Sequence, residues 1–194
     1  MPGEILVIAE HWRGQAESIT LQLLTKGREL ADALGVGLDV LVLGHDVGSV
    51  VASLKDKGAD AIHTLDHAAL GDAACGALAE AAVAALRDIA PKLTLVGHTL
   101  VGMELGPAIA TRFGAVAMTN CVNIECAEGE FIVTRPVHDG ALHAKIALDR
   151  GAPALCALQK GATPTLPLPP REAQIRALTV DVSSLPRRGE ILDR

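Results

Sequence analysis

The chain has 194 residues, which is enough for one ordinary domain with an extension or for two very small domains. Hydrophobic residues make up 49% of it and aromatic residues only 2%, so the core must be built from Ala, Val, Leu and Ile, as is typical of a buried parallel sheet covered by Ala-rich helices. The net charge of −6 and the shortage of rings argue against nucleic-acid binding, and no apolar run is long enough for a secretory signal or a membrane span, so we expect a cytoplasmic protein.

The first half of the chain alternates between short apolar runs and longer stretches with helical periodicity. Strands are predicted over 5–9, 38–43, 61–65 and 93–96, and helices from Ser18 to Gly35, over about 47–57, over 72–90 and over roughly 103–113. Ser18 is expected to cap the first helix, and Asp72 stands near the start of the third. Successive β-α steps imply right-handed crossovers. The predicted fold class is therefore α/β, with an open, doubly wound, mostly parallel sheet that is Rossmann-like or adenine-nucleotide-hydrolase-like.

From about residue 117 the pattern changes to extended runs separated by turns. Residues 122–126 and 131–135 flank a turn at 127–130 and predict a hairpin. Further runs over 141–148 and 153–159 predict an antiparallel or mixed extension of the sheet, at an open edge. A proline-rich stretch follows Gly161, and 175–182 alternates like a strand that pairs with this domain or with another subunit. We therefore predict a domain over 1–161, then a linker and carboxyl-terminal extension over 162–194.

The residues with reactive side chains do not form a recognisable active site. The cysteines are irregularly spaced and are expected to be buried free thiols, and no group of histidines and cysteines has metal-ligand spacing. A histidine follows each predicted strand end, at His11, His45, His67 and His98. Such a set fits either proton transfer or ordinary polar loops. We expect no catalytic activity from the chain alone.

The loop from Gly97 to Gly102 leads into a predicted helix, so its backbone N–H groups could receive an anion. It lacks the lysine of a phosphate-binding loop and the three-glycine spacing of a dinucleotide site. A weak phosphate site and a purely structural loop both remain open. The residues alone thus predict a soluble α/β domain, with a nucleotide-like cleft as an open alternative.

Four segments, taken together, resemble a known family. They are ILVIAEH at 5–11, LVLGHDVGSVVASLKDKGADAIHTLD at 41–66, LTLVGHTLVGMELGPAIATRFGAVAMTNCVNIE at 93–125 and FIVTRPVHDGALHAKI at 131–146. In this order they are similar to the amino-terminal domain of electron-transfer flavoprotein alpha subunits, over about residues 4–161. The fourth segment is the most specific, because composition does not demand an Arg-Pro pair between two strands.

The resemblance implies a role in electron transfer. Alpha subunits of this family pair with a beta subunit, and the heterodimer binds FAD and transfers electrons between flavoprotein dehydrogenases and a quinone- or ferredoxin-linked acceptor. Their main FAD lies in a carboxyl-terminal domain that would begin where this chain ends. The resemblance therefore implies a docking subunit, with FAD held mainly elsewhere. A stand-alone nucleotide-binding or regulatory module without redox activity is the alternative, and a homodimer is also open.

The resemblance also implies a set of cofactor-binding residues. Thr134 and Arg135 align with the family's Thr-Arg, which lies close to the beta subunit and its nucleotide cofactor, and Thr99 and Gly102 would complete the same site. Arg135 could supply a cation to a flavin or to a phosphate such as that of AMP; otherwise it pairs with a carboxylate on a neighbouring strand. The sequence departs from the family at Asn120, where Asp is usual, and at 158–161, where Leu-Gln-Lys-Gly replaces Val-Arg-Pro/Gly.

Overall fold

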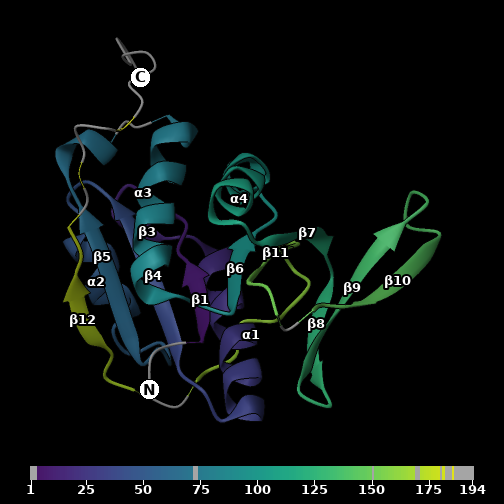
Figure 1. The fold of residues 1–194 in the computed structure, drawn as a ribbon. Helices are drawn as coiled ribbons and strands as arrows, with labels where there is room; N and C mark the ends of the chain where they lie inside the picture. Colours follow the sequence, from purple (N-terminus) through teal and green to yellow (C-terminus); the bar gives the residue numbers. More distant parts are fainter. Residues whose placement is uncertain are drawn as a thin grey trace.

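The computed structural model describes residues 4–71, 74–149, 151–168 and 171–179, together with residues 181 and 185. Within these residues the centre is a seven-stranded sheet in the order β12-β5-β4-β1-β6-β11-β7, and neighbouring strands are parallel throughout (Figure 1). The strands are β1 (Ile5–Ile8), β4 (Leu38–Gly44), β5 (Ala61–Asp66), β6 (Leu93–Gly97), β7 (Val116–Cys121), β11 (Ala154–Leu158) and β12 (Gln174–Ala177). The predicted α/β class with an open parallel sheet is confirmed.

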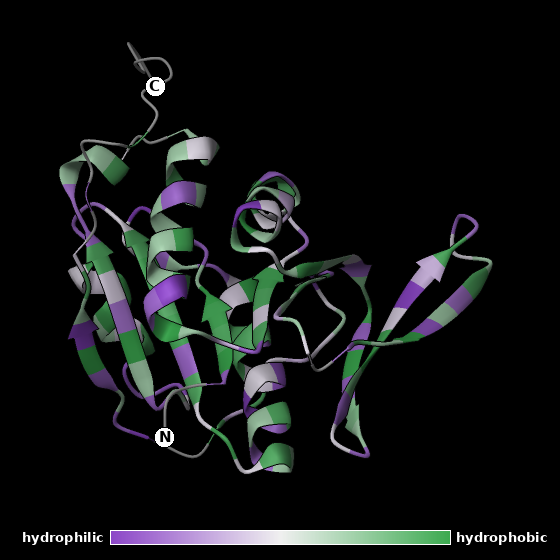
Figure 2. Ribbon diagram, viewed as in Figure 1, coloured by the Kyte–Doolittle hydropathy of each residue, from purple (hydrophilic) through white to green (hydrophobic). Residues whose placement is uncertain are grey.

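Helices cover both faces of this sheet. The helices are α1 (Ser18–Leu34) and α2 (Gly48–Leu54) on one face, and α3 (Cys75–Ile89) and α4 (Leu100–Phe113) on the other. Along β1, Ile5 and Val7 pack on the α1 side whereas Leu6 and Ile8 pack on the α3 side. Because both faces are buried, the central strands are hydrophobic along most of their length (Figure 2). None of the helices in the described part of the chain is long and apolar enough to cross a membrane.

Two helix starts differ from the sequence-based expectation. The expected cap at Ser18 is wrong, because Glu17 holds the N-cap position without a side-chain cap and Ser18 is already helical. Helix α4 begins at Leu100, earlier than expected, because the hydroxyl of Thr99 caps it by accepting the N–H of Gly102 at 3.0 Å. Asp72 lies outside the described residues.

The second half of the chain adds strands to the large sheet and forms a separate antiparallel sheet. The predicted hairpin is present as β8 (Asn123–Ala127) and β9 (Glu130–Val137), and β10 (Leu142–Ala147) completes a separate three-stranded antiparallel sheet, order β10-β9-β8, that projects from the body (Figure 1). The run at 153–159 does not extend this antiparallel part. It forms β11, which inserts in parallel between β6 and β7. The late run forms β12, which pairs with β5 of the same chain; Val180 and Val182 lie outside the described residues.

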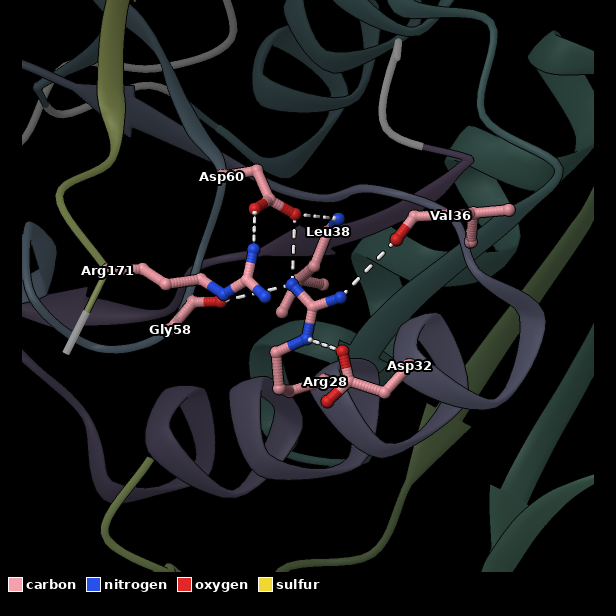
Figure 3. Close-up of polar contacts among 7 residues, drawn as sticks. All are labelled: Arg28, Asp32, Val36, Leu38, Gly58, Asp60 and Arg171. Atoms are coloured by element: carbon pink, nitrogen blue, oxygen red, sulfur yellow. Dashed lines mark hydrogen bonds and ion pairs between the residues drawn. The ribbon is translucent and has the colours of Figure 1, made fainter. Parts of the chain in front are cut away.

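A buried arginine joins α1 to the segment that precedes β5. The guanidinium of Arg28 lies 2.9 Å from the carboxylate of Asp60 and 2.8 Å from that of Asp32, and donates to the carbonyls of Gly58 and Val36 (Figure 3). Asp60 also accepts the N–H of Leu38 at the start of β4. Helix α1, β4 and the loop before β5 are therefore tied together by one carboxylate–guanidinium group.

The segment after residue 161 packs against the domain. Arg171 donates to Asp60 at 2.7 Å, Glu172 pairs with Lys55 at 2.8 Å, and the side chain of Leu168 lies directly over Gly58. These contacts lead the chain to β12 at the far edge of the sheet. The predicted boundary at residue 161 stays a prediction.

Candidate functional site

The candidate site is a crevice at the carboxyl ends of the central strands. From β1 the chain winds outward to β4 and β5, then crosses back through α3 to β6 on the other side of β1. Such a reversal in strand order leaves a crevice in open α/β sheets, and ligands bind there. Here it has a volume of about 820 Å³ and is lined by residues that follow β1, β4, β6 and β11.

At its centre, a carboxylate meets the start of α4. The hydroxyl of Thr99 lies 2.9 Å from each carboxylate oxygen of Glu10, to which it donates, and it accepts the N–H of Gly102. Sequence analysis predicted Thr99 and Gly102 as site residues, and both line the crevice. It did not single out Glu10. The only available signal was the position of this glutamate directly after the first strand.

Two glycines make this close approach possible. A Cβ on Gly102 would lie 1.8 Å from the carbonyl oxygen of Gly97, and a Cβ on Gly97 would lie 2.5 Å from Oε1 of Glu10. Neither distance is attainable for a real side chain. Glycine is therefore required at Gly102, where a Cβ would meet backbone, whereas a Cβ at Gly97 would force the side chains of Glu10 and Ile19 to move.

The electrostatic environment raises the pKa of Glu10. Burial is the main cause, and the negative charge of Glu17 adds to it, while the hydrogen bond from Thr99 and the charge of Lys160 oppose it. No ion pair joins Glu10 to a basic side chain within the described ranges. The crevice thus contains a partly desolvated carboxylate without a salt-bridge partner.

The histidines at the strand ends do not act together. His11, His45 and His98 line the crevice, but His67 does not. The ring of His11 donates to the carbonyl of Leu43 at 2.8 Å, and His67 accepts the N–H of Ala69. No group of three potential metal ligands was found in the part of the chain that the structure describes. The structure therefore gives no proton-transfer chain or metal centre among these histidines.

Thr134 and Arg135 lie on β9, beside the crevice and not in its lining. The Arg135 charge and burial together lower the pKa of His98, burial more strongly, so the guanidinium lies near the crevice wall. Three buried polar atoms have no hydrogen-bond partner within the described residues: Nδ1 of His98, Oγ1 of Thr134 and Nε of Arg135. Because Thr134 and Arg135 are consecutive on β9, their side chains point to opposite faces of the small sheet. The charge of Arg135 therefore acts on His98, which lines the crevice.

Comparison with known proteins identifies the family of the chain. The family model described as "Electron transfer flavoprotein domain" matches residues 5–183. The chain belongs to this family. It is 29% identical over 166 residues to an electron transfer flavoprotein subunit alpha of Clostridium acetobutylicum, covering 84% of this chain and 49% of that protein. It is 27% identical over 191 residues to a FixB protein of Clostridium saccharobutylicum, covering 97% and 57% respectively.

A further relative is the LctC subunit of the lactate dehydrogenase (NAD(+),ferredoxin) of Acetobacterium woodii, which is 27% identical over 156 residues, or 80% of this chain and 37% of that subunit. The chain spans about half the length of the curated relatives it matches. The resemblance to the amino-terminal domain of electron transfer flavoprotein alpha subunits is confirmed.

The two departures from the family pattern touch one another. The side-chain amide of Gln159 donates to the Oδ1 atom of Asn120 at 2.5 Å, and the N–H of Gln159 donates to the carbonyl of Cys121. Asn120 has a φ of 60°, in the left-handed region that asparagine tolerates, at a shift in register between β7 and β11. A neutral amide pair therefore stands where the resemblance implies an acid and an arginine.

Behind this pair lie two thiols. Cys121 and Cys156 are buried and free, as predicted, whereas Cys75 and Cys126 are free but only half-buried. A hydrogen bond with Cys156 and the charge of Arg135 lower the pKa of the Cys121 thiol, although burial opposes them. The pKa of Cys156 is raised in turn by the same hydrogen bond and by burial. Arg135 thus acts on both Cys121 and His98.

Proposed function

We propose that this chain is a cytoplasmic docking subunit of an electron transfer flavoprotein-like complex. It pairs with a beta-like subunit, and the complex carries electrons from a flavoprotein dehydrogenase to an acceptor while FAD is held mainly elsewhere. The observation that carries the proposal is the family match over residues 5–183. The names of the relatives support it, since several are subunits of electron transfer complexes.

The surroundings of Arg135 support a contact with another chain. No ion pair of Arg135 is found in the described part of the structure, so the alternative of a carboxylate on a neighbouring strand has no support there. Among the described residues, its Nε and the hydroxyl of Thr134 are buried without a hydrogen-bond partner. The Arg135 side chain as a whole is half-buried, so the rest of its guanidinium is free to bind a partner's carboxylate or a cofactor phosphate. Arg135 and Thr134 are therefore proposed as interface residues beside the cofactor.

The crevice itself does not suit FAD. The sequence contains one Trp, two Phe and no Tyr, and both phenylalanines, Phe113 and Phe131, pack against the core clusters. Among the described residues that line the crevice, Trp12 is the one Phe, Tyr or Trp side chain, and the other rings there are the imidazoles of His11, His45 and His98. The start of α4, where a phosphate would bind, faces the carboxylate of Glu10. These features support an assembly in which the flavin is bound mainly outside this chain.

The proposal is tested by co-expression with a beta subunit of the family. The lone chain should be colourless, and the pair should elute together in size-exclusion chromatography. Arg135→Gln should weaken pairing by about ten- to a hundredfold, because a charge-assisted hydrogen bond contributes roughly 1.5–3 kcal/mol. Lys145→Ala is the matched control: it removes a positive charge from the same small sheet, where Lys145 already pairs with Glu125. Tightly bound flavin on the lone chain, or unchanged pairing of Arg135→Gln, would contradict the proposal.

The alternative is a stand-alone nucleotide-binding module without redox activity. The volume and position of the crevice favour it, whereas the carboxylate of Glu10 opposes a nucleotide phosphate at α4. A thermal shift with AMP or ATP, without any pairing to a beta subunit, would support this alternative.

A further inference from the structure

The start of α4 has the geometry of an anion site. The helix has 14 residues, and the N–H groups of its first turn and its dipole both favour negative charge. It opens into the crevice of about 820 Å³. In an α/β sheet this is the place where a phosphate or carboxylate of a ligand is usually held.

Here the chain supplies that anion itself. Both carboxylate oxygens of Glu10 lie 2.9 Å from the capping hydroxyl of Thr99, and the carboxylate packs against the backbone at Gly97. The carboxylate therefore lies beside the start of the helix, on the crevice side, and it contacts the helix through the Thr99 hydroxyl. A phosphate brought to the same place would meet a like charge in a partly desolvated setting, where repulsion is strong.

The backbone of Glu10 is fixed in this position. Its N–H donates to the hydroxyl of Thr20 at 2.8 Å, and that hydroxyl donates to the carbonyl of Glu10 at 2.8 Å. The N–H of Glu17 donates to the same carbonyl at 2.9 Å. Thr20 is fully buried. A ligand could not displace this segment without breaking these hydrogen bonds.

We infer that Glu10 sets the ligand class of this crevice. Its carboxylate holds the anion position at the start of α4, so the crevice rejects phosphate-bearing ligands and favours an uncharged or cationic group that donates hydrogen bonds. The inference rests on the geometry of Glu10, Thr99 and α4 and does not depend on the proposed role in electron transfer.

The experiment is calorimetric titration of the purified chain with AMP and with adenosine, which differ only in the phosphate. Glu10→Gln keeps the size and one of the two acceptor oxygens that the Thr99 hydroxyl uses, replaces the other with an NH2 donor, and removes the charge. It should bind AMP at least about tenfold more tightly than the unmodified chain, whereas its affinity for adenosine should change by less than about threefold. Glu17→Gln is the matched control. It removes another carboxylate that lines the crevice but is not bonded to Thr99, so its gain for AMP should be smaller.

Several results would overturn the inference. One is an unmodified chain that binds AMP as tightly as Glu10→Gln does, or more tightly than it binds adenosine. Another is a Glu10→Gln variant, shown by circular dichroism to be folded, that gains no affinity for AMP. If Glu10→Gln gained the same affinity for AMP and for adenosine, the substitution would only have enlarged the crevice. If Glu17→Gln gained as much affinity for AMP as Glu10→Gln, the effect would be due to overall charge. If Glu10→Gln does not fold, Glu10→Ala is titrated in its place with the same expectation.

Discussion

Arg28 and Arg171 bind the same carboxylate, that of Asp60, and replacing each with alanine should give very different losses of stability (Figure 3). The side chain of Arg28 is 6% exposed and that of Arg171 is 49% exposed. An exposed pair contributes about 0–1 kcal/mol, because water screens it and the long side chain loses entropy. Arg171→Ala should therefore cost about 1 kcal/mol at most.

Arg28→Ala should lower the free energy of unfolding much more than Arg171→Ala does. It leaves the carboxylate of Asp60 with only the N–H of Leu38 and the exposed Arg171, and it leaves the carbonyls of Gly58 and Val36 without their arginine donor. Removing one partner of a fully buried pair costs about 3–5 kcal/mol, and we expect the lower end of this range because the side chain of Asp60 is 32% exposed. The carbonyl losses overlap with this figure and are not added to it.

The measurement is equilibrium unfolding in urea, followed by circular dichroism. With a slope of about 2–3 kcal/mol per M, the midpoint of Arg28→Ala should fall by roughly 1–2.5 M and that of Arg171→Ala by less than about 0.5 M. Arg28→Lys should be intermediate, since a lysine keeps the charge but cannot reach all the acceptors. Equal midpoints for the two alanine variants would refute the argument that burial decides the strength of these ion pairs.

Three further outcomes are expected. Because the folded-state pKa of Glu10 is raised above its unfolded value, the folded protein binds more protons between these two values, and stability should fall as the pH rises through that window; Glu10→Gln should remove this loss in urea titrations at a series of pH values. Gly102→Ala should lower the melting temperature by several degrees, since its Cβ would overlap the backbone, whereas Gly48→Ala, with nothing within 4 Å, should be neutral or slightly stabilising. Asn120→Asp and Gln159→Arg should each destabilise alone and restore one another, with a coupling of about 0.5–3 kcal/mol in a double-mutant cycle.

The sheet was predictable from the sequence because its strands are buried on both faces. In a chain so poor in aromatic residues, continuous hydrophobic runs such as Ile5–Ile8 and Leu93–Gly97 are typical of buried parallel strands. The same property explains the misassignment of β11. A short run that is apolar throughout has the same sequence pattern in a parallel and in an antiparallel sheet. The partners of β11, which are β6 and β7, are set by long-range packing.

The position of the crevice was predictable from the sequence, but the charged group at its centre was not. The rule that ligands bind at strand ends leads to the crevice, and Thr99 and Gly102 do lie there. The partner of Thr99 is 89 positions away in the sequence, and no local pattern indicates that Glu10 fills the start of α4. The capping role of Thr99 was missed for a related reason, since the helix was expected to begin after it.

The opposite charges of Glu10 and Arg135 both bear on the function of this region. Glu10 puts a negative charge where the anion of a ligand would bind, so the chain itself provides the anion at this end of the crevice. Arg135, on the projecting sheet, has a buried Nε without a hydrogen-bond partner among the described residues. A protein whose main task was to hold a nucleotide in the crevice would be expected to have these charges the other way round. Both charges are therefore in keeping with the proposed docking role, which places the partner at the surface around β9 and leaves the crevice without a nucleotide.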